Sequence, residues 1–122
     1  MDPSLAQDLL ALLTERQQRA MQRRDALQGD LADIVERSSD ASRDDEHDPE
    51  GVTIAFERAQ VASLLAAAEL ELVDVDRAVD RVRAGTHDRC QACGGEVPAE
   101  RLRARPATRT CVSCSRAGTV GG

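Results

Sequence analysis

Lysine, asparagine, tryptophan and tyrosine are all absent from this chain of 122 residues, and Phe56 is its one aromatic residue. This absence excludes a β-sandwich or barrel whose core is built on aromatic side chains. Leucine, valine, isoleucine and alanine must therefore fill the interior. All 16 cationic side chains are arginine, and with 22 acids the net charge is -6. A chain this acidic is a poor general binder of nucleic acid, because neutralising phosphates requires a basic surface.

Long hydrophobic runs are also missing. No segment approaches the roughly 20 apolar residues of a membrane span. The opening residues Met1-Asp2-Pro3-Ser4 have none of the features of a signal peptide. We therefore expect a cytoplasmic protein that does not contact a membrane.

The clearest pattern that is present is a heptad repeat in the second half of the chain. Positions at alternating steps of four and three hold eight apolar residues out of nine, namely Ile54, Arg58, Val61, Leu65, Ala68, Leu72, Val75, Val79 and Val82. Such alternation over four heptads is typical of a coiled coil. We expect this helix to end near Ala84, with Gly85 as its C-terminal cap residue.

A second heptad pattern precedes it. Seven of the nine positions are apolar in the series Ala6, Leu10, Leu13, Gln17, Ala20, Arg24, Leu27, Leu31 and Ile34. Leu5, Leu9 and Leu12 widen the apolar stripe at its start. The two patterns predict a mainly α fold, a long antiparallel coiled-coil hairpin over residues 1–84. A parallel homodimer through the same seams is an alternative that the pattern leaves open, although we expect a monomer.

The connection between the two patterns, at about residues 38–51, is acidic. It carries six acids and one arginine and has no periodicity. The pair Asp48-Pro49 has the form of a helix start, with Asp as N-cap and Pro at the first helical position. One interpretation is therefore a helix cap with a solvated loop, and the other is a functional acidic tip. Calcium binding is disfavoured because the acids lack the spacing of a calcium loop.

All four cysteines lie in the last third of the chain, as two C-x2-C pairs with a longer spacer between them. The residues are Cys90, Cys93, Cys111 and Cys114. This spacing is typical of a zinc site, because each C-x2-C turn directs two sulfur atoms to one point. Four thiolates leave no open position, which indicates one structural zinc ion and no hydrolytic metal. We expect a zinc finger at residues 85–116 and a flexible tail at residues 117–122. Two disulfides or a redox-active site are the alternatives.

Four arginines lie between the two cysteine pairs, namely Arg101, Arg103, Arg105 and Arg109. They are interpreted either as a charged surface around the finger or as a docking face for an acidic partner or a phosphate. No aromatic residue is interleaved with them, which argues against stacking on bases. The chain also shows no pairing of a nucleophile with a base, so we do not expect an enzyme.

Residues 84–114 resemble the four-cysteine zinc finger of the DksA/TraR family. The resemblance rests on the Ala84-Gly85-Thr86 lead-in, Gly94 after the second cysteine, the Val97-Pro98 step, the R-L-x-A-x-P stretch at 101–106 and the C-V-x-C close at 111–114. The preceding hairpin is similar to the family's architecture. The resemblance implies a regulator that binds RNA polymerase without contacting DNA. The zinc module would dock at the rim of the secondary channel, and the acidic tip would reach toward the active centre.

The residues that the resemblance assigns to the tip are Asp48 and Glu50, with Asp45 behind them. The family's tip motif D-x-x-D-x-A is absent, and counting back from the first cysteine places Glu50 at its second acidic position. Of the three basic positions that serve the alarmone ppGpp in the family, Arg105 alone matches, because Asp74 and Ser115 stand at the other two. Synergy with ppGpp is therefore expected to be weak or absent. The alternative function is a zinc-ribbon scaffold or adaptor that binds another partner through the side of the rod.

Overall fold

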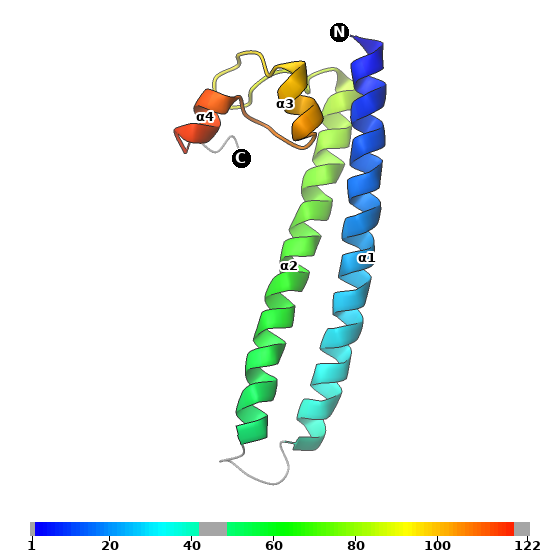
Figure 1. Ribbon diagram of the computed structural model, residues 1–122, viewed down its shortest axis with the longest axis vertical. Coiled ribbons are helices and arrows are strands. Elements are labelled where there is room, and N and C mark those ends of the chain that lie inside the picture. The colour runs from blue at the N-terminus through cyan, green and yellow to red at the C-terminus, as the bar shows by residue number, and fades with distance from the viewer. Residues whose placement is uncertain (1, 42–48, 119–122) are drawn as a thin grey trace. The chain divides into compact units, whose positions relative to one another are not determined.

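The computed structural model describes residues 2–41 and 49–118, apart from the side chains of residues 40 and 41. Two long helices, α1 (Pro3–Ala41) and α2 (Pro49–Ala84), are followed by the short helices α3 (Ala99–Ala104) and α4 (Val112–Arg116) (Figure 1). Between Ala84 and Ala99, one isolated antiparallel bridge joins Arg89 to Glu96. The mainly α fold predicted from the sequence is confirmed.

Helix α1 extends further than the sequence predicted. Residues 38–41 belong to α1, although we expected them in the connecting loop at about residues 38–51, whereas residues 49–51 belong to α2, as the Asp48-Pro49 helix start had indicated. The reason is local, because no glycine or proline lies between Gly29 and Pro49 to end α1 earlier. Pro49 begins α2, as expected for a proline at the first helical position. The expected N-cap, Asp48, lies outside the described residues.

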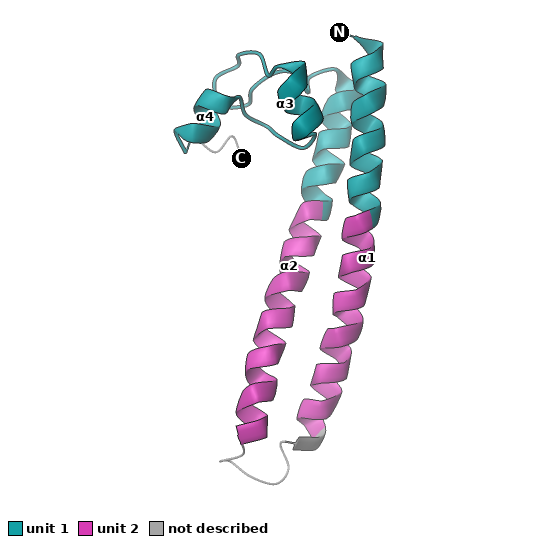
Figure 2. Cartoon of the chain, viewed as in Figure 1, with its two compact units in different colours: residues 1–18, 72–122 teal, residues 19–71 magenta. Residues whose placement is uncertain are grey.

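The chain divides into two compact units, which are described separately. Unit 1 comprises residues 1–18 and 72–122, and unit 2 comprises residues 19–71 (Figure 2). The finger forms one unit with the start of α1 and the end of α2.

Unit 2 is an antiparallel pair of helical segments. Arg23 of α1 forms an ion pair with Glu71 of α2 (Nη1–Oε2 3.1 Å), and Arg37 forms one with Glu57 (Nη2–Oε1 3.4 Å). The step forward from Arg23 to Arg37 on α1 therefore equals the step back from Glu71 to Glu57 on α2. This constant register over two heptads is the geometry of an antiparallel coiled coil.

The predicted seam matches the observed burial. All nine predicted positions on α1 are buried or half-buried, and so are eight of the nine on α2. Arg58 is the exception, since its side chain is exposed. The burial of Ala20, Ile34, Ile54 and Ala68 within unit 2 follows directly from the heptad spacing.

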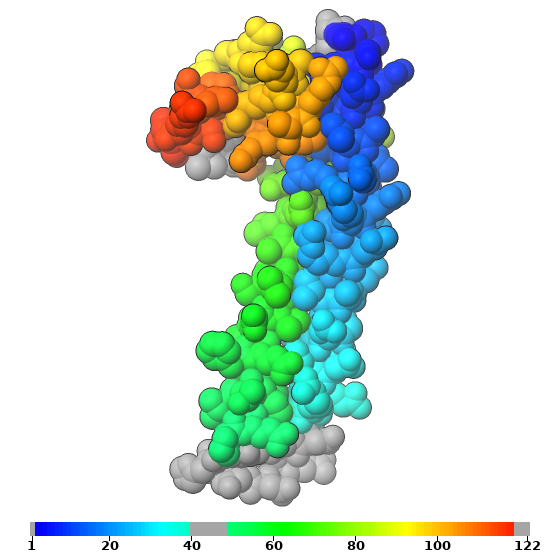
Figure 3. All heavy atoms as spheres, viewed as in Figure 1, coloured from blue at the N-terminus to red at the C-terminus, as the bar shows by residue number. Residues whose placement is uncertain are grey.

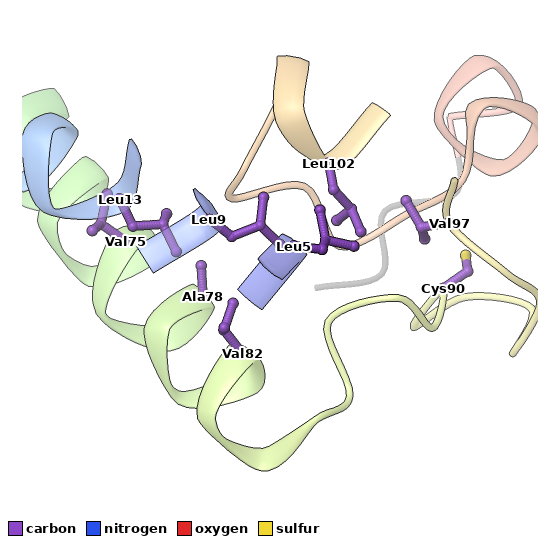
Figure 4. Close-up of a cluster of buried hydrophobic side chains, with 9 residues drawn as sticks. All are labelled: Leu5, Leu9, Leu13, Val75, Ala78, Val82, Cys90, Val97 and Leu102. Atoms are coloured by element: carbon purple, nitrogen blue, oxygen red, sulfur yellow. The ribbon is translucent and has the colours of Figure 1, made fainter. Parts of the chain in front are cut away.

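Unit 1 has a single apolar core to which both the helices and the finger contribute. The space-filling view shows the finger packed directly against the first turns of α1 (Figure 3). The core beneath this contact consists of Leu5, Leu9, Leu13, Val75, Ala78, Val82, Cys90, Val97 and Leu102 (Figure 4). The extra leucines at the start of α1 therefore serve the finger, because Leu5 and Leu9 widen the stripe toward it.

The end of α2 agrees with the sequence prediction. Gly85 adopts a positive φ of 79° directly after Ala84. The amide of Thr86 donates to the carbonyl of Arg81 (2.9 Å), and the amide of Gly85 donates to that of Val82 (3.1 Å). These two bonds form a Schellman motif, which satisfies the last carbonyls of the helix and turns the chain into the finger.

No helix within the described residues is both long and apolar enough to cross a membrane.

Candidate metal centre

The first cysteine pair sits in a tight turn closed by backbone hydrogen bonds. The amide of Gly94 donates to the carbonyl of Cys90 (2.8 Å), and the amide of Cys90 donates to the carbonyl of Gly95 (2.7 Å). Gly94 has a positive φ of 76°, a conformation that glycine adopts without steric cost. The amide of Gly95 also donates to Sγ of Cys93 (3.4 Å). Such a bond orients a sulfur ligand and stabilises its thiolate form.

The second pair is placed by the start of a short helix. Cys111 is the N-cap residue of α4, and Cys114 lies within that helix. The amide of Ser115 donates to the carbonyl of Cys111 (3.0 Å). The loop that carries Cys111 is joined to the first turn through the amide of Gln91, which donates to the carbonyl of Arg109 (2.8 Å).

The four sulfur atoms fit a tetrahedral metal site. All lie within 4.8 Å of one another, and Sγ of Cys93 is 3.9 Å from Sγ of Cys111. Zinc–sulfur bonds of about 2.3 Å in a tetrahedron separate the sulfur atoms by about 3.8 Å. A disulfide would require about 2.05 Å, and all four cysteines are free. The arrangement therefore fits one structural zinc ion, with no ligand position left open, and not two disulfides.

The thiols differ in acidity. Backbone hydrogen bonds from Cys111 and then Cys93 lower the pKa of the Cys90 thiol to about 6. Hydrogen bonds with the Cys111 and Cys93 thiols raise the pKa of Cys114 to about 12. Without a cation the cluster thus retains a proton at neutral pH. Zinc supplies the positive charge that brings all four sulfur atoms to the thiolate form.

The part of the chain that carries this centre is rich in arginine. Four thiolates with one Zn²⁺ carry a net charge of about -2, and residues 85–122 hold six arginines against three acids. Arg81 donates from Nη2 to the carbonyl of Ala107 (3.3 Å). Its pKa is lowered by burial and by the nearby Arg109, and raised by Asp74. Arg81 lines the same hollow as Cys90, so its charge partly offsets the negative charge of a zinc-loaded site.

The four arginines considered for docking occupy different environments. Arg101 is engaged internally, because its Nε donates to the carbonyl of Thr110 (2.9 Å) and its Nη2 to the hydroxyl of Thr108 (3.3 Å). Arg103 pairs with Asp8 of α1 (Nη2–Oδ2 3.3 Å). Arg109 is half-buried, whereas the Arg105 side chain is exposed. Arg105 is therefore the member of this set best placed to meet a partner.

The expected tip and alarmone positions are only partly within the described structure. Glu50 lies in the first turn of α2 and is exposed, whereas Asp45 and Asp48 lie outside the described residues. In unit 1, Asp74 is half-buried and Ser115 is exposed. Neither of these two residues carries a positive charge.

One residue of this region was missed by the sequence analysis. His87 is buried, with 3% of its surface exposed. Neither of its ring nitrogens has a hydrogen-bond partner among the described residues. A histidine between Thr86 and Asp88 gives no sign of burial, because its environment depends on how the finger folds onto the helices.

Comparison with known proteins gives a consistent result for the finger and for the fold. Residues 83–117 match the family model described as the prokaryotic dksA/traR C4-type zinc finger. An uncharacterized protein of Aquifex aeolicus (strain VF5) is 41% identical over 44 residues, which is 36% of this chain and 30% of that protein. The matched segment thus spans less than a third of that relative's length.

Among solved structures, transcription factor DksA2 from Pseudomonas aeruginosa has the same fold. The TM-score is 0.78 at 22% identity, covering 97% of this chain and 85% of that one. The likeness therefore includes the helical hairpin as well as the finger.

Proposed function

We propose that this chain, which carries a zinc finger of the DksA/TraR family at residues 83–117, is a transcription regulator that binds RNA polymerase. The observation that carries the proposal is the finger itself, in its setting at the base of a helical hairpin. The cysteine pairs, the Val97-Pro98 step and the buried Leu102 are all features of the family-matched segment. The protein acts by binding and not by catalysis, contacts no DNA and works in the cytoplasm.

In this proposal the finger docks at the rim of the polymerase secondary channel. Arg105 is exposed and carries no internal ion pair within the described residues, so it can meet an acidic surface. Arg103 already pairs with Asp8 and Arg101 bonds to the Thr108–Thr110 loop, so these two hold the docking face in shape. Zinc supplies the folding energy of this face when bound.

The acidic connection between α1 and α2 is the part that reaches toward the active centre. Glu50 is exposed in the first turn of α2, and Asp48 and Asp45 precede it in the sequence. Carboxylates brought near the catalytic Mg²⁺ or near basic loops would change the local electrostatic potential. Regulation would thus combine occlusion of the channel with placement of negative charge.

Response to ppGpp is proposed to be weak or absent. A highly anionic ligand would meet Arg105, but it would also meet the Asp74 carboxylate and the uncharged Ser115. One cation and one acid give little net attraction for several phosphate charges.

The experiment is binding of the zinc-loaded protein to purified core RNA polymerase. Arg105→Glu is compared with Arg77→Glu, a matched charge reversal at an exposed arginine of α2. We expect Arg105→Glu to weaken binding at least tenfold and Arg77→Glu to change it less than twofold. Absence of wild-type binding at concentrations up to about 10 µM would overturn the proposal, and equal losses in both variants would overturn the docking role of Arg105.

A further inference from the structure

Helix α2 carries a second apolar stripe that the hairpin does not use. Within unit 2 this outer stripe comprises Val52, Phe56, Ala59, Ser63, Ala66 and Leu70. Each lies two residues from a seam position such as Ile54, Val61 or Ala68. Two residues correspond to about 200° around a helix, so the stripe lies opposite the seam. All of its side chains are exposed.

This face is unusually apolar for a helix surface. Phe56 is 77% exposed, Val52 is 72% exposed and Leu70 is 66% exposed. From Ala59 to Ala68, ten consecutive residues of α2 include no charged side chain. A solvated helix face is normally polar, and a contiguous apolar patch usually marks a contact surface.

The outer stripe has the spacing of a coiled-coil seam, and that spacing is the same in both directions. Its steps along the chain are four, three, four, three and four residues. Two antiparallel copies can therefore be aligned about a two-fold axis level with Val61. This alignment sets Val52 against Leu70, Phe56 against Ala66 and Ala59 against Ser63. An interface with two-fold symmetry requires such a self-complementary patch.

The sizes of these residues favour the antiparallel over the parallel arrangement. In the antiparallel pair Phe56 meets the small Ala66, and the two small residues Ala59 and Ser63 meet at the centre. A parallel, in-register pair would instead set Phe56 against its own counterpart, directly beside a layer of two Ala59 residues. Large and small residues that alternate across facing positions interdigitate, whereas two large residues beside two small ones leave gaps.

The flanking residues are compatible with the same arrangement. In the antiparallel pair, residues that flank one side of the stripe face residues that flank the same side of the stripe on the other copy. Glu69 therefore lies opposite Ala55. Gln60 faces the Gln60 of the second copy near the axis, where the two amides can hydrogen-bond. No like charges therefore meet along the stripe.

We propose that the outer stripe of α2 in unit 2 is the interface with a second copy of this chain, arranged antiparallel about a two-fold axis level with Val61. The exposed side chains of the stripe suggest a total buried area on the order of 1,000 Å², the low end of specific interfaces. We therefore expect a dissociation constant on the order of 10 µM. The proposal differs from the monomer expected from the sequence, because that expectation considered only one stripe of α2.

The charge of unit 2 makes the association depend on salt. Residues 19–71 hold 13 acids against six arginines, so two copies repel each other. Salt screens this repulsion, while apolar contacts are not weakened by it. The dimer is therefore expected to tighten as ionic strength rises, opposite to an interface held by ion pairs. If the proposed function is right, the dimer also keeps this hairpin from entering a channel, but the interface does not depend on that function.

The first test is sedimentation equilibrium of the full, zinc-loaded chain from about 1 µM to about 200 µM, which brackets the expected dissociation constant. We expect a monomer–dimer equilibrium that Phe56→Ser weakens at least tenfold. The control Val35→Ser also removes an exposed apolar side chain of unit 2, but it lies on α1 and should leave the equilibrium within twofold. Circular dichroism checks that both variants remain helical. A wild type that stays monomeric over this whole range, or equal effects of the two variants, would overturn the proposal.

The second test addresses the register. In the antiparallel dimer a Gln60→Cys variant places its two thiols near each other, whereas the thiols of Thr53→Cys lie about 20 Å apart along the axis. Both positions are exposed and lie on the same side of the stripe. Under mild oxidation of the zinc-loaded protein we expect Gln60→Cys to form a linked dimer at least tenfold faster. Equal rates would overturn the antiparallel arrangement. A monomeric wild type whose polymerase binding is lost in Phe56→Ser would overturn the dimer and assign this face to polymerase instead.

Discussion

Leu9 of α1 and Leu102 of α3 are both fully buried in one apolar cluster, although they lie near opposite ends of the chain. Through this cluster, which also contains Val82 of α2, the finger and the base of the hairpin share a core. The finger is therefore not an independent module attached by a linker. Its stability and that of the adjoining helix ends depend on the same contacts.

The first prediction concerns this shared core. Leu102→Ala should lower the free energy of unfolding by about 2 to 4 kcal/mol, because it removes a fully buried side chain and leaves a cavity. Leu64→Ala, at a half-exposed position of α2, should cost less than about 1 kcal/mol. Urea denaturation of the zinc-loaded proteins measures both. Equal costs would show that the finger does not pack on the helices as described.

Zinc removal should separate the contributions of the finger and the helices. The finger helices α3 and α4 hold only 6 and 5 residues, against 39 and 36 in α1 and α2. A strong chelator should therefore unfold the finger while most of the far-ultraviolet helical signal remains. The loss should be concentrated in unit 1, which hydrogen exchange measured on residues 3–13 and 75–84 can detect. Readdition of zinc serves as the control, and loss of most of the helical signal would contradict the division into units.

The pKa values of the thiols predict how zinc affinity varies with pH. The raised pKa of Cys114, about 12, means that zinc must displace a proton from it throughout the neutral range. The lowered pKa of Cys90, about 6, means that this thiol is mostly protonated only below that pH. Zinc must displace a second proton from the cluster there. The affinity for zinc should thus rise with pH. Below pH 6 it should fall by a further factor of about ten for each pH unit, because Cys90 must then lose a proton as well. Competition with a chelator of known affinity measures this slope, and a slope unchanged across pH 6 would refute the assignment.

His87 can be used to measure how much a buried polar side chain without a hydrogen-bond partner costs in stability. Its imidazole is buried without a hydrogen-bond partner among the described residues, which costs stability. His87→Phe keeps a flat ring in the site and removes the unsatisfied nitrogens, so it should raise the free energy of unfolding by about 1 kcal/mol. His87→Ala is the matched control, and it should lower stability because it leaves a cavity. Destabilisation by the Phe substitution as well would indicate a partner such as a buried water.

The sequence was most informative where a single local pattern decides the structure. Heptad spacing identified the buried positions from Ala6 to Val82, and the rule for glycine at helix ends identified Gly85. Cysteine spacing identified the four sulfur atoms that come together. Each of these three features depends on residues that are close in the chain or on the single repeat length of the heptad pattern.

Features that depend on tertiary packing were not predictable in the same way. The burial of His87 and the internal bonds of Arg101 arise only when the finger folds against the helices. The role of Leu5 and Leu9 was not apparent for the same reason, because the finger that covers them lies at the other end of the sequence. The end of α1 near residue 41 was misjudged because acidic composition was interpreted as a loop, although no helix-breaking residue separates Gly29 from Pro49.

The most direct test of the account compares polymerase binding and transcription in the same reactions for three proteins. These are the wild type, Asp48→Ala/Glu50→Ala at the tip, and Asp30→Ala/Asp33→Ala, which removes two exposed acids from α1. We predict that all three bind core RNA polymerase with affinities within threefold of one another, and that only the tip variant loses its effect on transcription. A wild type that does not bind polymerase, or a tip variant that regulates transcription as the wild type does, would contradict this prediction.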